Sequence, residues 1–194
     1  MTDRPVRIPP QPPEEWSEAT RIALGDVVEV GGVARPIHLP SVIAHHPTYL
    51  APYLGWAKAI ALHGVLSPRH NEILALRTAY LCQSDFEWGA HTQYALGRGC
   101  LTDDEIGAVA HGPRATLWDP IERTLLHAAD ELHEDSSIGE ATWTQLAAAF
   151  DHDALLEMVF VVGHYTMLSM VANSAGVQRE SGWPTVPTST DSSH

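Results

Sequence analysis

The chain has 194 residues with 24 acidic side chains against 11 lysines and arginines, which gives a formal net charge of −13. That length suits one domain with a sizeable core. The acidity argues against nucleic acid or an anionic membrane as a partner, because both are bound through clustered cations. The cysteines Cys82 and Cys100 do not make a disulfide framework, and the first fifteen residues lack the apolar segment of a signal peptide. We therefore expect a cytoplasmic protein.

The two ends of the chain differ in composition from its middle. Residues 1–40 are predicted to form an N-terminal arm: prolines up to about residue 13 forbid a regular helix, a short helix follows over 14–24, and a loop over 25–40 carries the turn signal Gly31-Gly32. Residues 177–194 are rich in Ser, Thr and Pro and are expected to be disordered. Residues 41–176 are predicted to be a helical domain.

Helix-start signals divide this helical domain. A short helix over 41–46 and a longer one over 48–63 are separated by Pro47. Ser67 is a good N-cap for a helix that should stop near Cys82. Further N-terminal signals stand at Ser84, Thr102, Asp119, Ser137 and Asp151. Because no strand signal of any length is present, the fold class is predicted to be all-α, with roughly seven to eight helices.

The last predicted helix is the most apolar segment. Residues 154–175 are nearly long enough to cross a bilayer, but Glu157, His164, Tyr165 and Asn173 argue against a membrane role. A helix that is apolar nearly all round is typical of the centre of a bundle or of a subunit contact. We expect one of those two places for it.

Residues 67–99 collect acids and imidazoles where two predicted helices meet. Ser84-Asp85-Phe86-Glu87 fits a capping box, in which the Ser84 hydroxyl and the Glu87 carboxylate each bond a free backbone N–H. His91 comes four residues after Glu87 and therefore lies on the same helical face. Glu72, Ser84, Glu87 and His91 are thus candidates for one site.

These residues carry a resemblance to the carboxymuconolactone decarboxylase family, which shares its fold with the alkylhydroperoxidase D enzymes. The peroxidase members carry Glu, eleven residues, Cys-x-x-Cys, three residues and His. In that frame Glu72 takes the Glu place, Ser84 and Glu87 the two Cys places, and His91 the His place. The resemblance runs from about Pro5 to Trp183, and the phrases EWxxH, ADELHEDS and VGHYTML support it.

The resemblance implies an alkylhydroperoxidase D-like helical bundle, assembled as a homo-oligomer (dimer, trimer or hexamer), with its pocket near the central helix pair and close to a subunit contact. Both redox cysteines are missing, which favours the cysteine-free, decarboxylase-like branch. The expected function is a cofactor-free acid/base enzyme that decarboxylates or isomerises a small lactone or carbonyl compound. His91 would transfer the proton as base or acid, Glu72 would be its partner or a second acid, and Glu87 would polarise or orient the substrate.

Four further residues are candidates for substrate binding: Ser84, Trp88, His164 and Tyr165. Each has a structural explanation beside the functional one. Capping accounts for Ser84 and also for Glu87, the core accounts for Trp88, and a satisfied polar group in the core or at a subunit contact accounts for His164 and Tyr165.

Two other functions stay open at this point. Thiol-dependent peroxide reduction would require Cys82 to be reachable and reactive, whereas a non-catalytic binding or assembly protein would use His91 for stability alone. A metal is not expected, because the helical pairs His127/Glu131 and Glu87/His91 offer two ligands each and no motif supplies the third.

Overall fold

The computed structural model describes residues 4–25 and 38–188, and within them it is all-α, as predicted. These residues form nine α-helices, one or two more than expected, and two short 3-10 turns, η1 (Pro13–Glu15) and η2 (Gly112–Arg114). The α-helices are α1 (Glu18–Gly25), α2 (His38–Ile43), α3 (Pro47–His63), α4 (Pro68–Leu81), α5 (Asp85–Gly97), α6 (Asp103–His111), α7 (Pro120–Asp135), α8 (Glu140–Ala147) and α9 (His152–Ala175).

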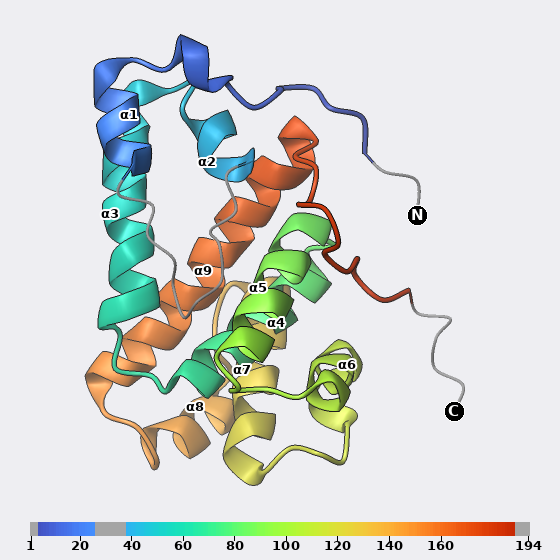
Figure 1. Cartoon of the computed structure of the whole chain (residues 1–194). Helices are drawn as coiled ribbons and strands as arrows, with labels where there is room; N and C mark the ends of the chain where they lie inside the picture. The colour runs from blue at the N-terminus through green and yellow to red at the C-terminus, as the bar shows by residue number, and fades with distance from the viewer. Residues whose placement is uncertain (1–3, 26–37, 189–194) are drawn as a thin grey trace.

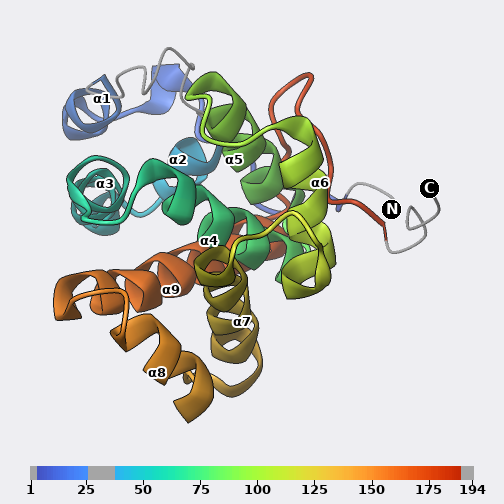
Figure 2. The same ribbon diagram turned by 90° about the horizontal axis from the view of Figure 1, so that it is seen from below.

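Helix α4 is the centre of the fold. It packs against α5, α7 and α9, and also contacts α6, so that it is surrounded in both views (Figures 1 and 2). Every residue from Asn71 to Ala79 is buried, including the charged Glu72 and Arg77. Arg77 is paired there: its Nε lies 2.6 Å from Oδ1 of Asp130 on α7. The central helix therefore carries buried charge that its neighbours must satisfy.

Most helix starts follow the capping signals read from the sequence. Ser67 and Asp151 accept the expected backbone N–H bonds, and complete capping boxes form at Thr102 with Glu105 and at Asp119 with Glu122. The prediction at Ser137 was wrong. The N-cap there is Gly139, two residues later, and α8 runs from Glu140 to Ala147. The Gly139 N–H donates to Glu131 on α7, so a neighbouring helix supplies the missing cap.

Helix α9 is the one helix in the described residues that is long and apolar enough to cross a membrane, and half of its most apolar window is buried inside the fold. The core helix of a soluble protein has the same properties. Its other side is an apolar stripe that the described residues leave partly exposed, formed by Leu156, Val159, Phe160, Met167 and Met170. The helix therefore lies in the bundle core, one of the two places expected for it, and also has an exposed apolar face.

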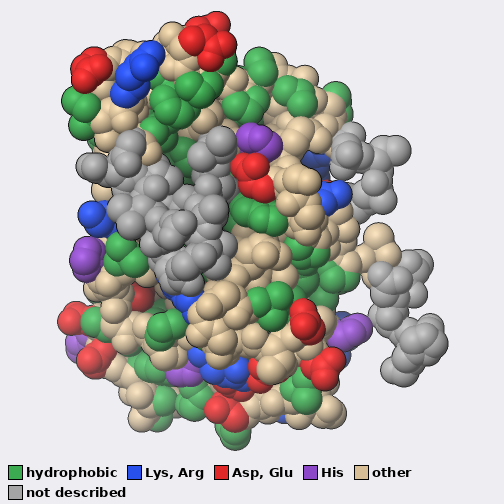
Figure 3. All heavy atoms as spheres, viewed as in Figure 1, with side chains coloured by type: hydrophobic (Ala, Val, Ile, Leu, Met, Phe, Trp, Pro, Cys, Tyr) green, Lys and Arg blue, Asp and Glu red, His purple; other side chains and the backbone are tan. Residues whose placement is uncertain are grey.

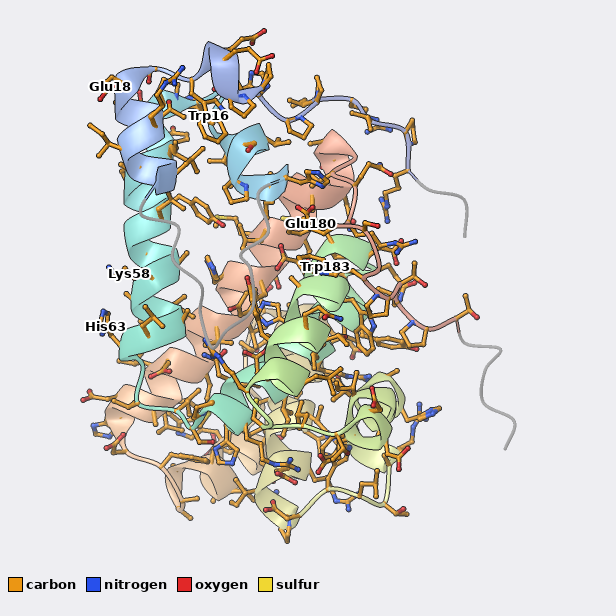
Figure 4. The ribbon with its side chains drawn as sticks, in the orientation of Figure 1. Trp16, Glu18, Lys58, His63, Glu180 and Trp183 are labelled. Atoms are coloured by element: carbon orange, nitrogen blue, oxygen red, sulfur yellow. The ribbon has the colours of Figure 1, made fainter. Side chains whose placement is uncertain are left out.

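Both ends of the described chain pack against the helices. In the arm, the backbone N–H groups of Arg7 and Ile8 donate to the Ala175 carbonyl at the end of α9. Residues 177–188 were expected to be disordered, but they run beside α5, with Val186 buried and Trp183 against Phe86 (Figure 4). The predicted loop turn at Gly31-Gly32 and residues 189–194 lie outside the described residues.

The surface reflects the acidic composition. On the face shown in Figure 3, acidic side chains are spread over many places, and basic ones occur in small groups among them. On α3, Lys58 and His63 point outward from the bundle (Figure 4). This distribution agrees with the net charge of the whole sequence.

Gly176→Ala is expected to lower the free energy of unfolding by about 2 kcal/mol or more. Gly176 ends α9 with a left-handed φ of 70°, and a Cβ added there would lie 2.0 Å from the Pro5 carbonyl oxygen. Urea unfolding measures the loss. The control is Gly55→Ala on α3, where the added Cβ meets no atom within 4 Å and a small gain in stability is expected. Equal effects of the two substitutions would contradict this account.

Candidate functional site

A cavity of about 100 Å³ lies where the α4–α5 corner faces α9. Its walls come from five helices, α2, α3, α4, α5 and α9. The lining is apolar on most sides, and its polar members are Tyr53, Asn71, Glu72, Glu87, His91, Tyr94, Arg98, His164 and Tyr165. A small, mostly apolar pocket with a few convergent polar groups is the form expected of a small-molecule site.

The corner between α4 and α5 is built around Ser84. Helix α4 ends with Gln83 in a left-handed conformation (φ 50°), and the Ser84 N–H donates to the Ala79 carbonyl, 3.0 Å away, as in a Schellman motif. The Ser84 hydroxyl meanwhile accepts from the Glu87 N–H and caps α5. The predicted capping box is therefore only half formed, because the Ser84 N–H that the Glu87 carboxylate would have bonded is already satisfied.

The Glu87 carboxylate lines the cavity, and it belongs to a row of four charged or titratable groups. His91 Nε2 lies 3.8 Å from Glu87 Oε2, and His91 Nδ1 lies 2.7 Å from Glu72 Oε2. The second oxygen of Glu72 lies 3.7 Å from Nη1 of Arg98. Glu72, Glu87 and His91 are each 3 % exposed. Three of the four frame residues predicted to form one site, Glu72, Glu87 and His91, therefore meet in space, on two helices that are consecutive in the chain.

Burial and mutual charge set the proton affinities in this row. Desolvation raises the pKa of Glu87 to about 7, against a smaller lowering by His91. Desolvation would lower the pKa of His91, but the charge and hydrogen bond of Glu72, with the charge of Glu87, outweigh it and leave that pKa above its usual 6.5. Glu87 and His91 can thus exchange a proton near neutral pH.

The wall opposite is aromatic and comes from α3 and α9. The ring of Tyr165 packs edge-on against His91 at 4.3 Å, and His164 packs against Tyr165 at 4.9 Å. Burial, with the nearby charge of His91, lowers the pKa of His164 to about 4, so its imidazole is neutral at ordinary pH. His164 Nδ1 and Glu87 Oε1 are buried without a hydrogen-bond partner in the described structure. Both are free to bond a ligand.

The predicted binding residues divide into two groups. His164 and Tyr165 line the cavity, whereas Ser84 and Trp88 do not. Ser84 is fully buried as the helix cap, and Trp88, 2 % exposed, packs in the core on the other side of α5. For these last two residues the structural explanation holds.

Sequence reasoning missed four polar residues of the cavity: Tyr53, Asn71, Tyr94 and Arg98. A signal existed for two of them. Tyr94 and Arg98 follow His91 by three and seven residues, which places all three on one helical face. Asn71 had no such signal, since it is the immediate neighbour of Glu72 in the chain. Its side-chain N–H group donates to the Ile60 carbonyl, and its carbonyl oxygen is buried without a partner.

Neither cysteine lines the cavity. Cys82 is half-buried just before the helix corner, with its Sγ 3.9 Å from Nδ1 of His133. Burial raises the pKa of the Cys82 thiol, and burial also raises that of Cys100. Raised thiol pKa values oppose nucleophilic chemistry at neutral pH.

The described residues contain no group of three or more His, Cys, Asp or Glu side chains placed to hold a metal ion. In the helical pair His127/Glu131, the carboxylate is used in hydrogen bonds within the protein. Glu131 accepts hydrogen bonds from Gly139 N–H and from the Thr142 hydroxyl at the start of α8.

The fold is similar to those of several solved structures. An uncharacterized peroxidase-related protein from Silicibacter sp. TM1040 shares 18 % identity over 94 % of this chain and 95 % of its own, with a TM-score of 0.72. A protein with an alkylhydroperoxidase AhpD core from Ralstonia eutropha JMP134 also shares 18 %, over 90 % and 93 %, with a TM-score of 0.73. The debrominase Bmp8, solved with 2,3,4-tribromopyrrole, shares 12 % over 90 % and 91 %, with a TM-score of 0.71. The chain therefore has the alkylhydroperoxidase D-like all-α fold.

A comparison of the sequence with protein-family models gives a match. The sequence model of the Carboxymuconolactone decarboxylase family matches residues 47–131, which include Glu72, Glu87, His91 and Arg98. The resemblance to this family that the motif frame predicted is thus found over residues 47–131. No functionally curated protein matches the chain in sequence.

Glu87→Gln is expected to stabilise the protein near pH 8 and to have little effect near pH 4.5. Folding raises the pKa of Glu87 from 4.5 to about 7, so the folded state binds this proton more tightly than the unfolded chain does. The stability gained from that proton is present below pH 4.5 and is lost as pH rises through 7, which amounts to about 3 kcal/mol at most. Glutamine has no proton to lose.

Urea unfolding at a series of pH values measures this effect. Glu134→Gln, at an exposed position near the end of α7, is the matched control and should show no pH-dependent difference from wild type. A stability difference for Glu87→Gln that is the same at both ends of the pH range would show that ionisation of Glu87 is not its cause.

Cys82 is expected to react more slowly with iodoacetamide in the folded protein than in urea near neutral pH, because the thiolate is the reactive form and burial disfavours it. Mass spectrometry of the intact protein follows the reaction, and Cys82→Ser assigns the remaining signal to Cys100. Faster alkylation in the folded state than in urea would favour a thiol-based activity.

Proposed function

We propose that this protein is a cofactor-free acid/base enzyme that decarboxylates or isomerises a small carbonyl or lactone compound. The observation that carries the proposal is the buried Glu72–His91 pair, which lies beside the unpartnered Glu87 oxygen in a mostly apolar cavity. Such groups supply a base, an acid and a partly dry site, which are the requirements of chemistry that passes through an enolate.

The geometry supports a separate role for each residue. Glu72 accepts from His91 Nδ1–H, which leaves Nε2 as the atom that faces Glu87 and moves the proton. At 3.8 Å, Nε2 and Glu87 Oε2 are too far apart for a hydrogen bond, so neither group is committed to the other. Glu87, with a pKa of about 7, is partly protonated at neutral pH and can donate to a substrate oxygen.

Both reactions follow from this arrangement. In isomerisation, His91 Nε2 takes a proton from the carbon next to the carbonyl, the C–H electron pair moves to the carbonyl oxygen, and protonated Glu87 donates a hydrogen bond to that oxygen. His91 then returns the proton to a different carbon. In decarboxylation, the C–C electron pair moves to the carbonyl oxygen as CO₂ leaves, and imidazolium Nε2–H protonates the carbon. Glu72 stabilises the imidazolium in each case.

Assembly and location complete the proposal. We infer a homo-oligomer that covers the apolar stripe of α9, since exposed apolar surface of this kind is typical of an interface. The acidic charge supports a cytoplasmic protein with no nucleic-acid or membrane partner.

The expected activity is proton exchange at the carbon next to a carbonyl. Carboxylated lactones and β-oxo acids are incubated with the protein in D₂O, while NMR follows deuterium incorporation and loss of CO₂. His91→Asn and Glu72→Gln are expected to lower the rate by about 100-fold or more. His111→Asn, at the exposed end of α6, is the control and should keep wild-type activity.

Thermal unfolding first establishes that the variants are folded. Equal exchange by wild type, His91→Asn and Glu72→Gln would exclude this site as the source of activity. If no compound is turned over, while His91→Asn alters only stability or assembly, the protein binds or assembles and does not catalyse. Peroxide consumption that needs Cys82 and a thiol donor would replace acid/base chemistry with redox chemistry.

A further inference from the structure

Among the described residues, three arginines with largely buried side chains contact carboxylates, and two of them donate hydrogen bonds from all three guanidinium nitrogens. Arg77 bonds both oxygens of Asp130 and also the carbonyls of Val109 and Ala110. Arg69 bonds Glu122, Glu105 and the Cys100 carbonyl. Their guanidinium groups are structural links between helices.

Arg98 differs from both. It follows the last residue of α5, its side chain is 19 % exposed, and it lines the cavity. Its one charged contact is Nη1 to Glu72 Oε1 at 3.7 Å, and its guanidinium makes no hydrogen bond to any residue in the described ranges 4–25 and 38–188. A mostly buried guanidinium with unused donors has lost much of its hydration without full replacement.

The unused donors are suited to one kind of ligand group. A guanidinium presents a planar fork of N–H donors that matches the two oxygens of a carboxylate. Glu72 does not fill this place, because its other oxygen is held at 2.7 Å by His91 Nδ1 and its near oxygen stays at 3.7 Å from Arg98. A ligand carboxylate can therefore bind Arg98 while Glu72 keeps its bond to His91.

The charge of the whole row also favours an anion. Glu72 and Arg98 offset each other. Desolvation of His91 is outweighed by its neighbouring carboxylates, which raise its pKa and favour the imidazolium below neutral pH. Glu87, with a pKa of about 7, is mostly neutral in the same range. The cavity therefore has net positive character below neutral pH, and a neutral ligand would leave that charge unmatched.

The cavity volume limits the ligand. A cavity of about 150 Å³ is enough for benzene, so the roughly 100 Å³ here limits the ligand to a compound of about benzene's size at most. Aliphatic oxo acids of three or four carbons are of this size.

We propose that Arg98 selects the substrate by binding the carboxylate of a small oxo acid, whose reacting carbon then faces His91. Glu72 lies between the two groups, with one oxygen toward each. The substrate carboxylate on Arg98 and the proton-transferring imidazole of His91 would then be separated by the carboxyl group of Glu72. This inference rests on the proposed acid/base function and names its substrate class.

Two matched pairs of compounds test it: pyruvate with pyruvamide, and acetoacetate with acetoacetamide. The members of a pair have the same shape, and the acid alone carries a charge. Calorimetry near pH 6.5 should show that wild type binds each acid about tenfold or more tightly than its amide. Arg98→Met should abolish that preference and leave amide affinity within about threefold, while Arg98→Lys should restore part of it.

Arg114→Met is the control, because it removes the same charge from an exposed residue at η2, outside this cavity. It should keep the wild-type preference. If wild type binds no acid more tightly than its amide, or if Arg98→Met keeps the preference, Arg98 does not read a substrate carboxylate and the proposal is wrong.

Deuterium exchange on the same four compounds separates this inference from the proposed function. If exchange depends on His91 but proceeds at the same rate with each acid and its amide, the proposed function is supported and the proposed substrate class is wrong. An acid preference that depends on Arg98, without exchange on any compound, would establish the anion site and overturn the acid/base function.

Discussion

The rest of this structure depends on the burial of a charged hydrogen bond between two consecutive helices. Glu72 on α4 and His91 on α5 are each 3 % exposed and are joined at 2.7 Å. A buried carboxylate without its imidazole partner would be costly, so each residue requires the other at this depth. The angle between α4 and α5 therefore has to keep these two side chains within hydrogen-bond distance, and the same pair supplies the proton-transferring group of the proposed reaction. Any change in the corner that separates the two side chains would leave a buried charge alone.

Glu87 and His164 are two titratable residues of one cavity, and burial shifts their pKa values in opposite directions. Both are desolvated, which keeps the imidazole of His164 neutral and makes the carboxyl of Glu87 reluctant to ionise. Neither has its free atom satisfied by the described protein. Buried polar groups left in this state oppose folding, and their position in the wall of one cavity is typical of a place that a ligand completes.

Much of the fold could be predicted because its signals are local. Helix starts are predicted by capping residues that lie directly before them: Ser67, Thr102, Asp119 and Asp151. The site is predicted by the spacing of Glu72, Glu87 and His91, which agrees with the motif of a family. What failed depended on distant parts of the chain. Gly139 takes its cap from Glu131 on another helix, and the tail is ordered by contacts of Trp183 and Val186 with α5. Arg98 could have been found by helical periodicity, but its unused donors are visible only when every neighbour is placed.

The corner at Ser84 has a consequence for how this fold can change. Because Ala79 takes the Ser84 N–H, α5 is capped without any help from the side chain at position 87. That position can then carry a carboxylate or another group while the helix start stays intact. The helix start and the reactive side chain therefore do not depend on each other. A few substitutions in the first turn of α5 can change the chemistry of the site while the fold is kept. Selection can act on the reaction at this place without first having to rebuild the protein.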